Sequence, residues 1–150
     1  MNKDSKDETT AHIMRVRELL YIVQNKLEER GFVHDLSKLK SPEKEGFDEV
    51  TGALRGLTYG SEAYKAQLER LKPILAHHYA HNSHHPEHYP NGVDGMTLLD
   101  LVEMFCDWKA ATERHAGGSV EKSIQHNKVR FNLSDQLASI LENSRKEMGW

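Results

Sequence analysis

Histidine is the residue type most concentrated in this chain of 150 residues. The sequence contains ten histidines, and six of them fall between His77 and His88. Imidazole side chains bind transition metals and exchange protons near neutral pH. Neither solubility nor packing requires such a concentration, so we expect this segment to take part in the protein's function.

A second feature is the adjacent pair His34 and Asp35, which lies among the apolar residues Phe32, Val33 and Leu36. An ionised aspartate near a core is costly unless it is paired or bound to a metal. A neighbouring histidine adds the nitrogen ligand of a divalent transition-metal site. The pair therefore predicts half of a metal centre.

Further donors are expected on two helices. His12 lies beside the apolar stripe of the first expected helix, and Asp107 lies between Phe105 and Trp108. A rival acid, Asp100, is explained by helix capping instead. We therefore predict a metal site with positions left open for water and substrate, formed by His12, His34, Asp35 and Asp107.

Apolar residues spaced three and four apart predict the helices that position these donors. A continuation of this spacing places His78 on an inward face. Gly31 is expected to end the first helix. The expected helices cover residues 10–30, 41–57, 61–78 and 97–116, with a loop over 82–96 and a last helix that opens at Ser134.

No run of alternating polarity predicts a strand. The fold class is therefore predicted to be all-α, as a single-domain bundle of five to seven helices spanning residues 1–150. Residues 1–9 are polar and charged, and we expect them to form a flexible N-terminus.

Charge and cysteine content exclude several classes of protein. The formal net charge of −3 gives no reason to expect nucleic acid or an acidic membrane as a partner. The lone Cys106 excludes an intramolecular disulfide framework and any zinc module built on two or more cysteines. No apolar stretch resembles a signal peptide or a membrane span, so the expected location is the cytoplasm.

Two segments carry a family resemblance. Residues 34–38 (HDLSK) and 103–110 (EMFCDWKA), together with a histidine on the first helix, resemble the signature of the HD-domain metalloprotein superfamily. Most members of that superfamily hydrolyse phosphate esters. Residues 84–88 (HHPEH) and 127–131 further resemble a small branch common in bacteriophage genomes, in which case the cytoplasm would be that of a host cell.

The resemblance implies roles for single residues. Asp35 matches the usual ligand that also helps to orient water, and Lys38 would offset charge on the transferring phosphate. His78 would protonate the leaving oxygen, since its ordinary pKa lies near the working range. The well-studied nucleotidase branch has a catalytic acid at the position of Lys38, so the proton-transfer scheme of that branch is not carried over.

The resemblance also implies one or two divalent metals per chain, with Mn, Fe, Co, Ni and Zn as candidates and Mg as an option. Dinuclear relatives bind a second metal through extra histidines between the HD pair and the last aspartate. The expected ligands for a second metal or a phosphate are His78 and either His84 or His85. Two cations near the C-terminus are weaker candidates for holding substrate phosphate, namely Lys128 and Arg130.

The expected function is a metal-dependent phosphoester hydrolase that acts on a small nucleotide, a nucleoside monophosphate first, in a chain that pairs as a homodimer. One alternative is an HD-type diiron oxygenase. Another is a non-catalytic, metal-dependent phage factor that binds a nucleotide or a protein. Simpler interpretations also exist: a helix-end ion pair for His34 and Asp35, a surface position for His12, and a surface partner of Lys109 or Arg114 for Asp107.

Overall fold

A computed structural model describes residues 5–54, 57, 61–114 and 116–150, with only the backbone of residues 54 and 64. The chain divides into two compact units, Met1–His34 and Asp35–Trp150. Each unit is described by itself.

The first unit consists of one long helix, α1 (Ser5–Val33). This helix confirms the predicted N-terminal helix, but it begins within the stretch expected to be flexible and runs through Gly31, which was expected to end it. None of its described residues is buried, and apolar residues of the predicted stripe, among them Val16 and Leu20, are exposed.

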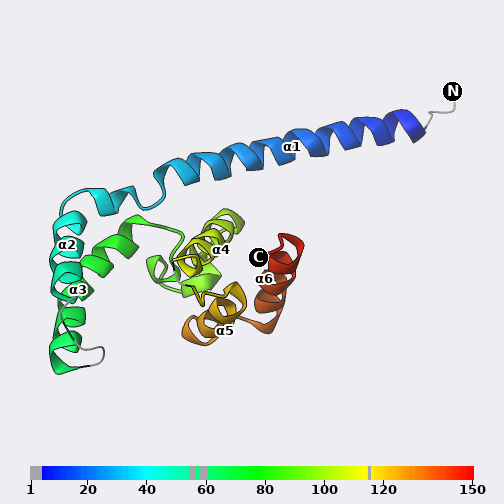
Figure 1. Ribbon diagram of the computed structural model, residues 1–150. Helices are drawn as coiled ribbons and strands as arrows, with labels where there is room; N and C mark the ends of the chain where they lie inside the picture. The colour runs from blue at the N-terminus through cyan, green and yellow to red at the C-terminus, as the bar shows by residue number, and fades with distance from the viewer. Residues whose placement is uncertain (1–4, 55–56, 58–60, 115) are drawn as a thin grey trace. The chain divides into compact units, whose positions relative to one another are not determined.

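The second unit is also helical, and no strand occurs among the residues described, so the predicted all-α class is confirmed. Six α-helices in the described chain fall within the predicted range of five to seven (Figure 1). The elements of the second unit are η1 (Leu36–Leu39), α2 (Glu43–Leu54), α3 (Glu62–His81), η2 (Pro86–His88), η3 (Gly92–Gly95), α4 (Leu98–Thr112), α5 (Val120–Arg130) and α6 (Asp135–Glu147). The second helix was predicted to extend to Leu57. Residues 55 and 56 are not among the described residues, so this extension stays a prediction.

The starts of two helices follow from their capping residues. Thr97 accepts a hydrogen bond from the backbone N–H of Asp100, and the Asp100 carboxylate accepts one from the backbone N–H of Thr97. This reciprocal capping box confirms the predicted start of α4. Ser134 is the N-cap of α6, and its hydroxyl oxygen accepts a hydrogen bond from the backbone N–H of Leu137.

Helix α5 was not predicted, and α4 ends earlier than expected. Ser119 caps α5, whose buried face consists of Val120, Ile124 and the polar Asn127. Only three of its eleven residues are apolar, and one of them, Val129, is exposed, which is too few for a recognisable stripe. The helix was expected to run to residue 116, just before Gly117 and Gly118, but α4 ends at Thr112.

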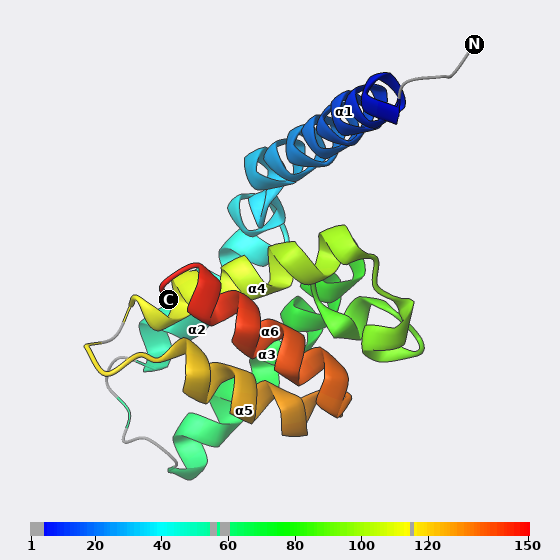
Figure 2. The same ribbon diagram turned by 90° about the vertical axis from the view of Figure 1, so that its right-hand side faces the viewer.

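The core of the second unit lies where α4, α5 and α6 pack together (Figure 2). Its buried residues are Met104, Phe105, Trp108, Val120, Ile124, Leu133 and Leu141. This packing fixes α4, whose other face carries Glu103 and Asp107 towards the histidine-rich segment. Among the described helices, none combines the length and the apolar character that a bilayer crossing requires.

Candidate metal centre

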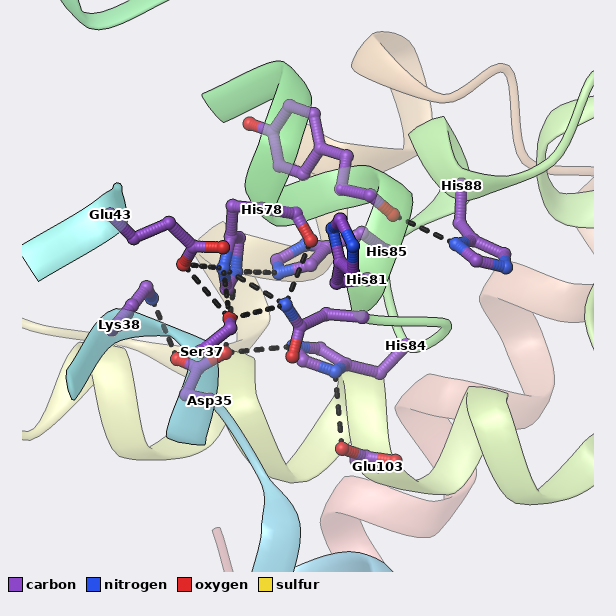
Figure 3. Close-up of polar contacts among 12 residues, drawn as sticks. Asp35, Ser37, Lys38, Glu43, His78, His81, His84, His85, His88 and Glu103 are labelled. Carbon is purple, nitrogen blue, oxygen red and sulfur yellow. Dashed lines mark hydrogen bonds and ion pairs between the residues drawn. The ribbon is translucent and has the colours of Figure 1, made fainter. Parts of the chain in front are cut away.

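Several segments of the second unit bring polar side chains to one place (Figure 3). Asp35 begins the unit in a left-handed conformation, with φ of 57°, which aspartate tolerates better than most residues. Helix α3 supplies His78 from its last turn and ends at His81. The chain then turns, with the N–H of His85 donating to the carbonyl of Asn82 over 3.3 Å.

The centre of this group consists of one carboxylate and three imidazoles. One donor atom from each of Asp35, His78, His84 and His85 lies within 4.8 Å of all the others. The Nε2 atom of His78 lies 3.3 Å from Oδ1 of Asp35, and Nε2 of His84 lies 3.6 Å from the same oxygen. His78 is 1% exposed and His84 is 2% exposed, so this is a buried set of nitrogen and oxygen donors.

Two outer carboxylates fix the orientation of these imidazoles. Glu43 Oε2 lies 2.8 Å from Nδ1 of His78, and Glu103 Oε1 lies 3.1 Å from Nδ1 of His84. A carboxylate can only accept, so each Nδ1 donates to its glutamate, while each Nε2 faces the centre. Carboxylate-bound histidines that turn Nε2 towards a common point are typical of metal ligands.

Electrostatics keep His85 neutral and Glu43 ionised. Burial, together with neighbouring His84 and His78, lowers the pKa of His85 to about 3, so this ring is neutral at physiological pH. Burial alone would raise the pKa of Glu43, but hydrogen bonds from His77, Ser37 and His78 outweigh it and lower that pKa. Glu43 is therefore ionised although it is 0% exposed.

A small network braces Glu43 against α3. The hydroxyl of Ser37 donates to Oε2 of Glu43 over 2.9 Å. The side-chain amide of Asn82 donates to Oγ of Ser37 and to the backbone carbonyl of His78, each over 2.8 Å. Figure 3 shows these contacts linking η1, α2 and the end of α3. The network fixes the position of the His78 ring.

Asp35 divides its two oxygens between the centre and a lysine. Lys38 Nζ lies 2.6 Å from Oδ2 of Asp35, and the same ammonium lies 5.7 Å from the centroid of the Phe47 ring. Oδ1 faces the histidines. Lys38 therefore orients Asp35. The predicted contact of Lys38 with a substrate phosphate stays a prediction.

Asp107 reaches the same centre from α4. One of its carboxylate oxygens lies within 4.8 Å of an oxygen of Asp35, and its charge acts on the ring of His85. Two carboxylates so close together repel each other unless a cation lies near both. Asp107 thus extends the donor set formed by Asp35 and the three histidines.

A cavity of about 530 Å³ lies beside this centre, and His85 and Asp107 form part of its wall. Three basic residues, Lys122, His126 and Arg130, line the cavity together with apolar side chains such as Trp108 and Phe131. Arg130 also pairs with Glu87, with 2.7 Å between Nη2 and Oε1. A volume of this size is typical of small-molecule sites.

The predicted residues divide into three groups. Asp35, His78, His84, His85 and Asp107 lie together in the second unit. His12, exposed on α1, and His34, half-buried after α1, belong to the first unit, so their part in the site stays a prediction. Arg130 lines the cavity, whereas Lys128 is not among its lining residues and pairs with Asp135 at 2.5 Å.

The sequence analysis did not identify Glu43 and Glu103 as site residues. A signal for Glu103 was present, because it lies four residues before Asp107 and therefore on the same helix face. Glu43 directly follows the Ser41–Pro42 helix start, where an acidic residue is ordinarily explained by the helix dipole.

Comparison with known protein families gave one match. A model described as "Family of unknown function (DUF5662)" matches residues 1–147. The match covers nearly the whole chain and includes both units, so the chain belongs to this family. Neither the search of curated proteins nor the search of solved structures found a match.

Proposed function

We propose that this member of the DUF5662 family is a metal-dependent phosphoester hydrolase of the HD type. The observation that carries the proposal is the cluster of Asp35, His78, His84 and His85 beside a cavity with basic groups on its wall. Metal ligands next to an anion-binding pocket are the two parts that phosphoester hydrolysis requires.

The donor set fits a divalent transition metal. Imidazole and carboxylate ligands suit Mn, Fe, Co, Ni and Zn, whereas a set dominated by imidazoles suits Mg less well. Asp35, His78, His84 and His85 would hold the ion, with Asp107 as a further oxygen ligand. A bound metal would supply an activated water and polarise a phosphoryl oxygen.

The remaining residues act by orientation and charge. Lys38 holds Asp35 through Oδ2, while Glu43 and Glu103 hold the rings of His78 and His84. The burial of His78 and its contact with Glu43 favour a ligand role over the expected role as proton donor to the leaving oxygen.

The substrate that suits the cavity is a small phosphoester. Lys122 and Arg130 provide cations for a phosphate, and His126 adds a third basic group. A nucleoside monophosphate is the first candidate, because the volume accommodates a molecule of that size and because the HD resemblance points to nucleotides.

The test is phosphate release from a panel of nucleotides and simple phosphoesters, measured with added Mn²⁺ or Co²⁺ and again with a chelator. We expect release from one class of substrate that the chelator abolishes. Tight nucleotide binding without release from any substrate would contradict the hydrolase and favour a metal-dependent binding factor.

Replacing Arg130 by glutamine tests the role of the cavity. We expect KM for the active phosphoester to rise about tenfold or more, which corresponds to the loss of one charge-assisted hydrogen bond, while metal content stays unchanged. The matched control is Lys128→Gln, two residues away and outside the cavity lining. Equal kinetics for both variants would remove Arg130 from the substrate site.

Iron-dependent oxygen chemistry is a second candidate. Histidines combined with a carboxylate, and with ligand positions left open, are also the donor set of non-haem iron oxygenases. Protein reconstituted with Fe²⁺ that consumes oxygen and shows no phosphate release would favour this function over the hydrolase.

A further inference from the structure

A pair of histidines lies on α3 outside the buried donor set. His77 and His81 are one helical turn apart, and their rings stack with centroids 4.1 Å apart and an angle of 23° between planes. His81 is exposed, and the side chain of His77 is 35% exposed. Neither residue belongs to the group formed by Asp35, His78, His84 and His85.

Both rings have their Nδ1 atoms engaged by acceptors. Nδ1 of His77 lies 2.8 Å from Oε1 of Glu43, and Nδ1 of His81 lies 2.8 Å from the backbone carbonyl oxygen of His77. A carboxylate and a carbonyl can only accept, so both Nδ1 atoms carry the proton. Each Nε2 therefore keeps its lone pair, which is the tautomer that binds metal ions.

We propose that His77 and His81 form a surface site for a divalent transition metal, with Cu²⁺, Ni²⁺ and Zn²⁺ as the class of ion. Residues four apart on a helix lie on the same face. Two imidazoles there can chelate one ion with bonds of about 2.0–2.1 Å when the rings turn from their stacked arrangement so that both Nε2 atoms face the ion. Water completes the coordination, because the site faces solvent. This proposal is independent of the proposed hydrolase.

The surface site shares a carboxylate with the buried centre. Oε1 of Glu43 contacts His77, while Oε2 contacts His78. One buried acid therefore orients a ligand of each site. Loss of its charge weakens both sites, whereas loss of the His81 ring weakens only the surface site.

The experiment is a Cu²⁺ titration of the full chain, followed by electron paramagnetic resonance, with Asp35→Asn/His84→Gln/His85→Gln as the background that removes three of the four donors of the buried centre. We expect one Cu²⁺ with hyperfine coupling to two nitrogens in this background. Adding His81→Gln should weaken its binding about tenfold or more and leave a signal from fewer nitrogens.

The matched control is His126→Gln, an exposed histidine on α5 with Lys122 and Arg130, not histidines, one turn away. This variant should bind Cu²⁺ as its parent does. Circular dichroism checks that each variant keeps its helices. In the same background, a folded His77→Gln/His81→Gln double variant with unchanged Cu²⁺ affinity overturns the surface site.

Discussion

Replacing Asp35 by asparagine is expected to lower the affinity for the catalytic metal by at least about 100-fold, with a matching loss of phosphoester hydrolysis. The physical reason is that one charged oxygen, Oδ1 of Asp35, faces both rings. It lies 3.3 Å from Nε2 of His78 and 3.6 Å from Nε2 of His84. Asparagine tolerates the left-handed conformation that residue 35 adopts, so the backbone of η1 should be preserved. Metal analysis after dialysis and turnover on the active substrate measure both effects.

The control for this variant is Asp48→Asn. Asp48 is an exposed aspartate on α2 that pairs with Lys44, so it matches the chemical change without touching the centre. Metal content and turnover should equal those of the unmodified chain. A folded Asp35→Asn protein that retained both metal and activity would show that the cluster is not the catalytic site.

Replacing Asp100 by alanine is expected to cost about 3 kcal/mol of unfolding free energy. Asp100 is 1% exposed, and its carboxylate accepts hydrogen bonds from Ser83, Tyr89 and both the backbone and the hydroxyl of Thr97. Alanine would leave these part-buried donors without their acceptor and would remove half of the capping box. Urea denaturation at neutral pH measures the loss.

The same carboxylate gives the fold a predicted sensitivity to acid. Burial would raise the pKa of Asp100, but the hydrogen bonds from Thr97, Ser83 and Tyr89 outweigh it and hold the pKa well below its usual value. The stabilisation is therefore complete above the unfolded pKa of about 4 and is lost as the pH falls from there towards the folded pKa. The stability difference between the parent chain and Asp100→Ala should shrink below about pH 4.

Asp94→Ala provides the comparison for Asp100. Asp94 is an exposed acid in the neighbouring η3, and its replacement should change stability by no more than about 0.5 kcal/mol. A loss for Asp100→Ala as small as that for Asp94→Ala would contradict the bracing role. Asp100 holds Ser83, which directly precedes His84. We therefore also expect Asp100→Ala to loosen the segment that carries the histidines.

The helices that sequence predicted best are those with strong local signals. The start of α4 could be predicted because Thr97 and Asp100 satisfy each other's backbone within one turn. Helix α5 could not, because tertiary packing of Ile124 against the core contributes more than any stripe in its own sequence. Gly31 was wrongly expected to end α1, since a glycine costs only about 1 kcal/mol inside a helix and marks an end only when its conformation is left-handed.

The site was predictable to the extent that its chemistry is local. The concentration of histidines identified His78, His84 and His85, and the unusual His34–Asp35 pair identified Asp35. Glu43 was not predictable, because its contacts with His77 and His78 join positions more than thirty residues apart. The same holds for Lys122 and His126, which become part of a cavity wall only when α5 packs beside α4.

The central claim is that the buried cluster of imidazoles and carboxylates holds a transition metal. Elemental analysis of the chain, purified without a histidine tag or chelator, tests it most directly. We expect about one or two transition-metal ions per chain, and we expect the Asp35→Asn variant to lose them. Absence of bound metal, both as purified and after incubation with Mn²⁺, Fe²⁺, Co²⁺ and Zn²⁺, would contradict the claim and the hydrolase proposed from it.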